Sequence, residues 1–313
     1  QAEVNQAKTL NEYEDELNKY LPGQSSNKLA DKVKIGNFVK YIPDTLDNSA
    51  LDKLKENLNT YSGKSDSTTN SAIARDSLSW RVLDIDEKTG AVRLISATPT
   101  NKKIELKGYD GYNNAVKLLD DACSTLYNSK LATKVQNLKI EDITKHMITQ
   151  PTEDTTEYHP EDINYPKILE QEKNQTVVKS TTENKLGVNS QSIFVTGYDT
   201  SATSTLKSNY WFKTMSENDF DRENKEMYYK LFINNGSNYP TYWMSSRCVR
   251  AYSDNAGFAV RSVDSGRVRA GGLYFSISIE DSHDYAFRPV ITLNSNVQAT
   301  SGNGTESSPF EIK

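Results

Sequence analysis

The sequence predicts an α+β fold built from twisted antiparallel strands and two main helices, with a further helix at the N-terminus. Two patterns carry this prediction. Short strand-like runs split by Gly, Ser, Asn and Asp fill the last third of the chain, and earlier segments place apolar residues at helical spacing. The chain has 313 residues, of which 35% are hydrophobic, so it is long enough to bury a substantial core.

The N-terminal segment, residues 1–30, predicts an amphipathic helix. Leu10, Tyr13, Leu17 and Leu21 recur at helical spacing with polar residues between them, and the pattern stops at Pro22. We therefore expect a short N-terminal helix, followed by a main domain at residues 31–313.

The first half of the main domain combines strands with helices. Residues 33–42 and 80–96 have extended patterns, and the second is predicted to fold into a hairpin with Gly90 in its turn. Residues 149–208 are polar and rich in Thr, Asn, Glu and Pro, which predicts an insertion or a long surface excursion. Helical spacing recurs in three segments, residues 51–58, 113–129 and 140–146.

The last third of the chain predicts antiparallel strands with elaborate loops. Apolar residues alternate there with polar or small ones, as expected when one face of a strand is buried. The strand-like runs are residues 242–249, 257–263, 267–269, 272–275 and 287–293. The residues predicted to form the core of this region are Trp243, Phe258, Val260, Val263, Val268, Leu273, Phe287 and Val290.

Charge and cysteine content exclude several classes of function. The net charge of −5 and the scattering of Lys and Arg among acidic residues leave no basic surface for nucleic acid. No apolar run is long enough for a signal peptide or a membrane span. Cys123 and Cys248 are too few for a disulfide framework or a zinc cluster, and we favour two buried free thiols over one long-range bridge.

The sequence contains no recognisable set of catalytic or metal-binding residues. His146, His159 and His283 are far apart, and none belongs to a metal-ligand or nucleophile–base motif. The Asp84, Asp86 and Gly90 positions lack the ligand spacing of a calcium loop. We therefore predict that the protein is not an enzyme and has neither a cofactor nor a bound metal.

Several short motifs occur in a specific order along the main domain. They are Trp80-Arg81-Val82-Leu83, Ile95-Ser96-Ala97, Gly108-Tyr109, Tyr112-Asn113-Asn114, Tyr242-Trp243, Ser265-Gly266 and Phe287-Arg288-Pro289-Val290. In this order they resemble a bacterial family of unassigned function whose fold is similar to C-type lectins and formylglycine-generating enzymes. The resemblance covers roughly residue 33 to the C-terminus, and it implies a C-type-lectin-like domain. Formylglycine-generating enzymes need a cysteine pair near the C-terminal end, where this chain has Cys248 alone.

The same region resembles the variable proteins of diversity-generating retroelements. Their lectin-like domain carries hypervariable residues just ahead of a last strand that contains Arg-Pro, and here residues 250–284 precede Arg288-Pro289. The resemblance implies a binding face at residues 247–288 whose positions differ between sibling genes. The candidate ligand-binding residues are Arg250, Tyr252, Asp254, Ser262, Asp264, Arg267, Arg269, Phe275, Ile277, Ile279, Asp281, His283 and Asp284.

Other conspicuous residues near this face are predicted to be structural. Arg247, Arg261 and Arg288 each lie inside an apolar strand, so we expect each guanidinium to pair with a carboxylate or a backbone carbonyl. The aromatic runs at residues 210–212 and 228–229 are more typical of core packing than of sugar binding.

A second resemblance concerns the N-terminus. Residues 6–17 are similar to the segment that follows the hydrophobic helix in type IV pilin-like proteins. This resemblance implies a pilus or membrane tether through a hydrophobic segment upstream, and hence a location at the cell surface. An ordinary helix packing on its own domain is the open alternative.

We therefore predict a secreted, cell-surface protein that binds a ligand without enzymatic activity, as an adhesin or display module. Its expected partner is a protein or glycan on another cell or host surface. A phage receptor-binding (tropism) protein of the same fold is the first alternative, and it would be expected to trimerise. An enzyme of the formylglycine-generating class is the second, and it would require a close cysteine pair or a metal in a cleft.

Overall fold

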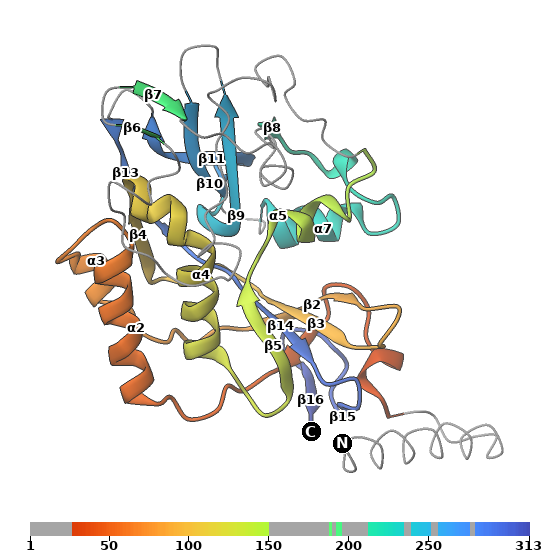
Figure 1. The fold of residues 1–313 in the computed structure, drawn as a ribbon. Helices are drawn as coiled ribbons and strands as arrows, with labels where there is room; N and C mark the ends of the chain where they lie inside the picture. The colour runs from red at the N-terminus through yellow and green to blue at the C-terminus, as the bar shows by residue number, and fades with distance from the viewer. Residues whose placement is uncertain are drawn as a thin grey trace.

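The protein is described by a computed structural model that covers residues 27–149, 188–189, 192–195, 212–234, 239–251, 256–275 and 279–313. Over these residues the chain has a mixed α+β fold with two large sheets, as the sequence predicts (Figure 1). The predicted N-terminal helix lies outside the described residues. Within the predicted insertion, only the short hairpin of β6 (Val188–Asn189) and β7 (Ser192–Val195) is described.

The first sheet joins the beginning of the main domain to its end. Its strand order is β15-β16-β1-β2-β3-β14-β5, and all neighbours are antiparallel except β1 and β16. The predicted hairpin is confirmed, because β2 pairs with β3 on either side of Gly90. The strands are β1 (Phe38–Lys40), β2 (Trp80–Ile85), β3 (Val92–Ser96), β5 (Ala132–Asn137), β14 (Pro289–Leu293), β15 (Ala299–Ser301) and β16 (Phe310–Ile312).

The second sheet carries most of the predicted binding residues. Its order is β12-β11-β10-β9-β13-β4, with β8 added beside β11. Two predicted runs, residues 267–269 and 272–275, belong to the single strand β11. The strands are β4 (Lys103–Lys107), β8 (Lys213–Thr214), β9 (Tyr242–Ala251), β10 (Ala256–Asp264), β11 (Arg267–Phe275), β12 (Ile279–Glu280) and β13 (Ser282–Ala286).

The second sheet is strongly curved, so that β11 comes into contact with the segment that contains β13. The strand β12 pairs with β11, whereas β13, which follows directly in the chain, pairs with β9 and β4. At the junction the Asp281 N–H donates to the Leu273 carbonyl at 2.9 Å, and Nε2 of His283 lies 3.1 Å from the Gly272 carbonyl oxygen. The indole of Trp243 packs against Gly271, where no Cβ intervenes. A glycine at this position therefore permits the curl.

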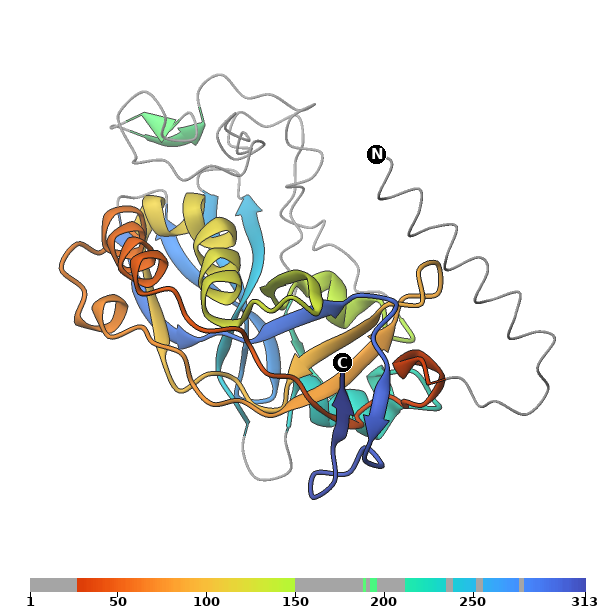
Figure 2. The same ribbon diagram turned by 90° about the horizontal axis from the view of Figure 1, so that it is seen from below.

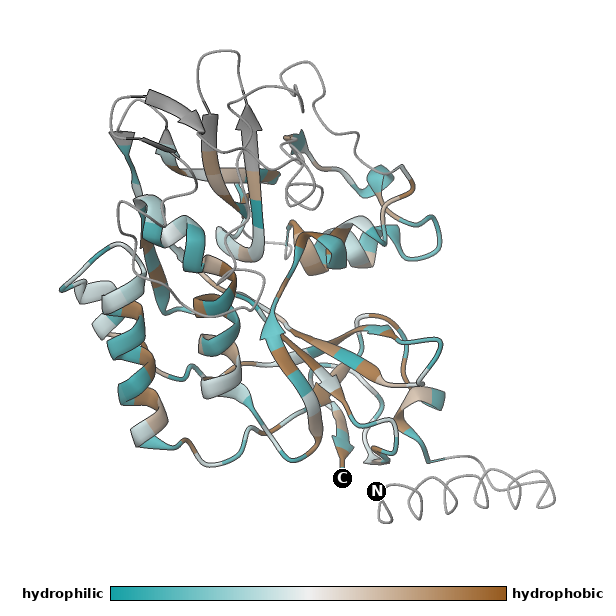
Figure 3. Ribbon diagram, viewed as in Figure 1, coloured by the Kyte–Doolittle hydropathy of each residue, from teal (hydrophilic) through white to brown (hydrophobic). Residues whose placement is uncertain are grey.

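The long helix α4 (Gly108–Tyr127) organises the larger core. It packs against strands of both sheets and against α2 (Asn48–Tyr61), which lies beside it in Figures 1 and 2. The two helices each have an apolar stripe, brown in Figure 3, and a polar stripe. Asp47 begins α2 by accepting the Ser49 N–H at 2.8 Å, as an N-cap residue does. The remaining helices are η1 (Leu29–Asp31), α3 (Thr68–Ser71), α5 (Ile140–Thr144), η4 (Glu217–Asp219) and α7 (Lys225–Phe232).

Two buried clusters stabilise this arrangement. The larger lies around α4, and the smaller lies where α5 and α7 cover strands such as β14. All eight residues predicted as the core of the last third are buried, with at most 1% of their surface exposed. Cys123 and Cys248 are free and buried, which confirms the preferred interpretation of the two cysteines. Among the described helices, none has the length and apolarity needed to cross a bilayer.

Candidate functional site

The predicted binding residues lie at two opposite ends of the long strands. Because β10 and β11 are antiparallel and nine residues long, their connecting turn is roughly 26 Å from their other ends. Asp264, Arg267 and Arg269 lie at the turn, so the structure divides the predicted face. At the other end, Arg250, Phe275 and Ile279 are found in β9, β11 and β12, whereas Tyr252, Asp254 and Ile277 fall outside the described residues.

The turn between β10 and β11 is tight. Ser265 and Gly266 have φ angles of 50° and 78°, the pair of positive values that a two-residue type I′ hairpin requires. A Cβ at Gly266 would lie 2.9 Å from the ring of Tyr239, so this ring rests directly on the turn. Both its backbone conformation and the ring of Tyr239 therefore hold the turn in place.

Asp264 holds this turn in place. Its Oδ1 accepts hydrogen bonds from the hydroxyls of Thr241 and Ser265, both at 2.9 Å, and its Oδ2 accepts one from Arg269 at 2.6 Å. Burial raises the pKa of Asp264, but these hydrogen bonds outweigh that effect and lower the pKa overall. Because both carboxylate oxygens have partners, Asp264 positions the hairpin, and its predicted role in ligand binding stays a prediction.

Arg267 is the exposed cation of the turn. Its guanidinium carbon lies 5.5 Å from the ring centroid of Phe212, within the range of a cation–π contact. Neighbouring cations are paired, Arg269 with Asp264 and Lys213 with Asp219, whereas Arg267 has no ion pair within the described part of the chain.

Two exposed aromatic residues complete this surface. Phe212 is 51% exposed and Tyr239 is 54% exposed, and both are among the few large hydrophobic side chains that face solvent in the described residues. The pairing of β8 with β11 places Phe212 next to Arg267 in space. The sequence prediction of core packing is therefore wrong for Phe212 and correct for the buried Tyr228. We call Phe212, Tyr239, Arg267 and Arg269 the hairpin patch.

The remaining predicted residues do not join the hairpin patch. Ser262 is 1% exposed, because β10 is flanked by β9 and β11 and a small side chain is covered there. Asp281 and His283 are half-buried at the junction that closes the sheet. Asp284 is exposed, but it lies at the far edge, where Lys103 pairs with it at 3.1 Å.

The structural interpretation of Arg288 is confirmed. Its Nε and Nη2 atoms donate to the Ser96 carbonyl at 3.2 and 3.0 Å, and its guanidinium lies over the ring of Tyr242. Arg288 and Arg261 are both fully buried, whereas Arg247 is only partly so and donates to the Asn113 carbonyl. Arg288 and Arg247 therefore connect elements of the fold.

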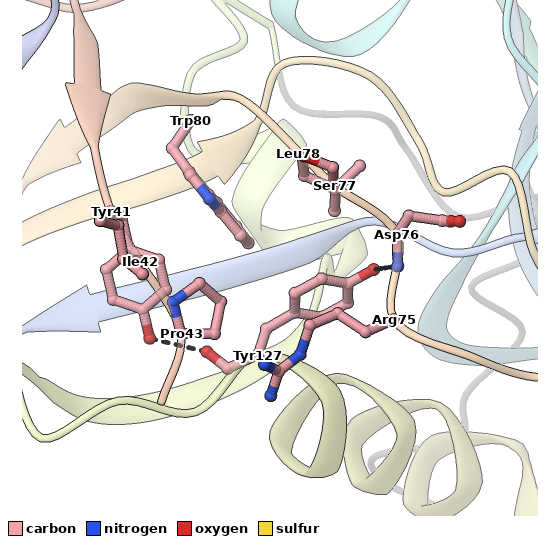
Figure 4. Close-up of a pocket in the computed structure, with 9 residues that line it drawn as sticks. All are labelled: Tyr41, Ile42, Pro43, Arg75, Asp76, Ser77, Leu78, Trp80 and Tyr127. Carbon is pink, nitrogen blue, oxygen red and sulfur yellow. Dashed lines mark hydrogen bonds between the residues drawn. The ribbon is translucent and has the colours of Figure 1, made fainter. Parts of the chain in front are cut away.

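A slot on the first sheet has aromatic walls, and two of its polar side chains bond to the end of α4 (Figure 4). The Tyr41 hydroxyl donates to the Tyr127 carbonyl at 2.6 Å, and Arg75 donates to the Leu126 carbonyl, so both satisfy the C-terminal end of α4. The rings of Tyr41, Trp80 and Tyr127 are at most 4% exposed. The residues of the slot therefore cap the C-terminal end of α4, and their buried rings offer little surface to a ligand.

One buried ionic network contains a histidine. Nε2 of His146 lies 3.2 Å from Oδ2 of Asp84, which also binds Arg93 and Lys145, and the imidazole stacks on Tyr228 with 4.0 Å between ring centroids. These contacts connect β2 to the segment after α5. Within the described residues, no cluster of three or more His, Cys, Asp or Glu side chains is arranged to hold a metal ion.

The hairpin patch thus combines one exposed guanidinium, two exposed rings and a rigid turn. Such a surface can form planar hydrogen bonds and apolar contacts with another molecule. No family model, curated protein or solved structure matches this chain.

Proposed function

We propose that this protein is a non-enzymatic binding protein of the cell surface, an adhesin or display module with a C-type-lectin-like fold. In this proposal the hairpin patch contacts a protein or glycan on another cell. The order of motifs from Trp80 to Val290 supports the fold assignment, and the mixed α+β architecture is consistent with it.

The observation that carries the proposal is the exposure of Arg267, Phe212 and Tyr239 around one braced turn. Arginine and aromatic residues dominate the binding energy of protein interfaces. A solvent-exposed ring contributes little to the stability of the free protein. Two such rings beside a guanidinium that has no ion pair among the described residues are typical of a contact surface. Because the turn is already ordered, binding would cost little conformational entropy.

The proposal extends to the other end of the same strands. Arg250, Phe275 and Ile279 lie near the β9–β10 and β11–β12 connections, far from the hairpin patch along the strands. We propose that substitutions at these positions change which ligand the protein binds, as in the variable proteins that this region resembles. Loops on a rigid scaffold tolerate such changes without loss of the core.

A cell-binding experiment tests the main proposal. The labelled full chain is incubated with intact bacterial cells and with animal cells, and saturable binding is measured by flow cytometry. The double variant Arg267→Ala, Tyr239→Ala is compared with Lys53→Ala, an exposed cation on α2. Truncation of one hot-spot residue weakens the binding free energy by about 2 kcal/mol. The double variant should therefore bind at least roughly 25-fold more weakly.

The control should bind like the unaltered protein. Equal binding by the double variant, or no saturable binding to any cell, would overturn the proposed role of the hairpin patch. Circular dichroism of each variant separates lost binding from lost folding, because the two mutated side chains are exposed and should leave the spectrum unchanged.

A further inference from the structure

The side chain of Met227 joins three segments of the fold. Met227 lies in the first turn of α7, and its Sδ is 3.0 Å from Nη2 of Arg81 on β2. The same sulfur rests on the backbone of Gly36, between η1 and β1, where an added Cβ would overlap it. The φ of Gly36 is 81°, a left-handed value that favours glycine. One thioether therefore holds α7 against two segments that lie far from it in the chain.

The groups around this sulfur are held in place by the protein. Nε of Arg81 donates to the Gly36 carbonyl at 2.9 Å, and its guanidinium carbon lies 4.8 Å from the ring centroid of Phe38. The Gly36 N–H donates in turn to the Val82 carbonyl at 2.8 Å. Because Arg81 and Gly36 are fixed, the 3.0 Å contact between Sδ and Nη2 has no room for another atom.

Met227 is the most accessible of the four methionines in the chain. It is half-buried, whereas Met147, Met215 and Met244 are buried with at most 7% of their surface exposed. A thioether has no proton to lose, so its oxidation by a peroxide depends mainly on access. The two cysteines, which hold the other sulfur atoms, are fully buried. Peroxide should therefore react with Met227 first.

Oxidation by hydrogen peroxide would place an oxygen atom on this sulfur. A lone pair of Sδ attacks one peroxide oxygen, the O–O bond breaks, and the sulfur loses two electrons as the S–O bond forms. The departing hydroxide takes the proton of the transferred oxygen and leaves as water. The sulfoxide is polar, so its oxygen is a stronger acceptor than the thioether sulfur. Arg81 can donate a charge-assisted hydrogen bond to this oxygen only if Sδ moves away from Nη2.

We infer that Met227 is an oxidation site at which a peroxide releases α7 from Arg81 and Gly36. Two residues further along α7, the hydroxyl group of Tyr229 is hydrogen-bonded to that of Tyr239, whose ring rests on the turn of the hairpin patch. A movement of α7 is therefore transmitted to the hairpin patch. Only the effect of this movement on cell binding rests on the proposed function.

Peptide mapping by mass spectrometry tests the site itself. The full chain is exposed to hydrogen peroxide for increasing times, and the oxygen added to each methionine is measured. Met227 should be oxidised at least roughly tenfold faster than Met147, Met215 and Met244. Equal rates at all four methionines, or slower oxidation of Met227, would overturn the inference.

Hydrogen exchange tests the structural consequence. In the oxidised protein the amides of α7 should exchange at least roughly tenfold faster, and a methionine sulfoxide reductase should restore the original rates. Met227→Leu keeps the apolar bulk without the sulfur, so α7 should exchange at the same rate with and without peroxide. Met215→Leu, the matched control, retains Met227 and should respond to peroxide like the unaltered protein.

Two results of this experiment would overturn the inference. One is oxidation of Met227 without faster exchange in α7, and the other is faster exchange after peroxide in the Met227→Leu variant. Cell binding is measured in parallel, and unchanged binding by the oxidised protein would refute the transmission from α7 to the hairpin patch. Absence of cell binding in every sample would overturn the proposed function and leave the oxidation site standing.

Discussion

Gly271 is the position where a single added methyl group should do most harm to the second sheet. A Cβ there would lie 2.6 Å from Cζ3 and 2.7 Å from Cη2 of Trp243, whereas ordinary contacts begin near 3.4 Å. The indole cannot retreat easily, because it is fully buried and its Nε1–H donates to the Ile104 carbonyl at 2.9 Å. Gly271→Ala should therefore force either the indole or the β11 backbone to move.

The magnitude follows from two opposing effects. Overpacking a well-filled core typically costs about 1–3 kcal/mol. Replacing glycine restricts the unfolded chain and stabilises the folded state by about 0.4–1 kcal/mol where the backbone conformation suits alanine. Gly271 has no positive φ angle, so this second effect applies. We expect Gly271→Ala to lower the free energy of unfolding by about 1–2 kcal/mol, measured by denaturant titration followed by circular dichroism.

A different glycine provides the matched control. Gly90 has a φ of 69°, and a Cβ there would meet no atom within 4 Å. Gly90→Ala should therefore cost about 1–2 kcal/mol through backbone strain alone, independently of Trp243. In a Trp243→Phe background, which lacks the two clashing atoms, the cost of Gly271→Ala should shrink while that of Gly90→Ala stays constant. An equal cost of Gly271→Ala in both backgrounds would refute the steric explanation.

Two further predictions concern titratable groups. Burial raises the pKa of Asp84, but its hydrogen bond with His146 and the charge of Arg93 help to outweigh this effect, so its pKa lies below the ordinary value of about 3.9. Ionised Asp84 therefore stabilises the folded state above that pH, and this stabilisation is lost as the pH falls through the pKa of the folded protein. Asp84→Asn should make the melting temperature depend less steeply on pH on the acid side. Burial also raises the pKa of Cys123 and Cys248, so a disulfide reagent should label neither thiol at neutral pH until denaturant is added. Rapid labelling of the native protein would contradict their burial.

The elements that the sequence predicted well are those whose signal is local. The apolar stripe of α4, which includes Leu118, Ala122 and Leu126, repeats at helical spacing and is fully buried. The hairpin of β2 and β3 has its turn glycine between two alternating strands. In both cases the residues that determine the structure are neighbours in the chain, so no distant contact has to be known.

The elements that were missed depend on distant partners. The strand β13 (Ser282–Ala286) is mostly polar, and it forms because β4, which lies much earlier in the chain, pairs with it. The helix α7 contains Tyr228 and Phe232, which become core only when α5 and the strands of the smaller core cover them. The strand β13 has little hydrophobic alternation, whereas α7 places Tyr228, Leu231 and Phe232 at helical spacing, a local signal that the sequence predictions did not include.

The candidate site shows the same division between local and distant information. Arg267 and Arg269 could be selected from the sequence because they lie within residues 250–284, the stretch that resembles the variable region. The role of Asp264 as a brace could not, since it depends on Thr241 across the β9–β10 pairing. Phe212 belongs to a separate segment and reaches Arg267 only through β8. The hairpin patch, which is assembled from three segments, therefore cannot be derived from one stretch of sequence.

The hairpin patch is separated from the core by a single step along the strands. Val263 and Val268 are paired directly below the turn and are fully buried, whereas the next pair outward is Asp264 with Arg267. Substitution of Arg267 therefore changes the surface without opening a cavity. Substitution of Asp264 removes the brace on which Thr241, Ser265 and Arg269 depend. If the proposed variation of the binding face exists, this geometry predicts variation at position 267 and retention of aspartate at position 264.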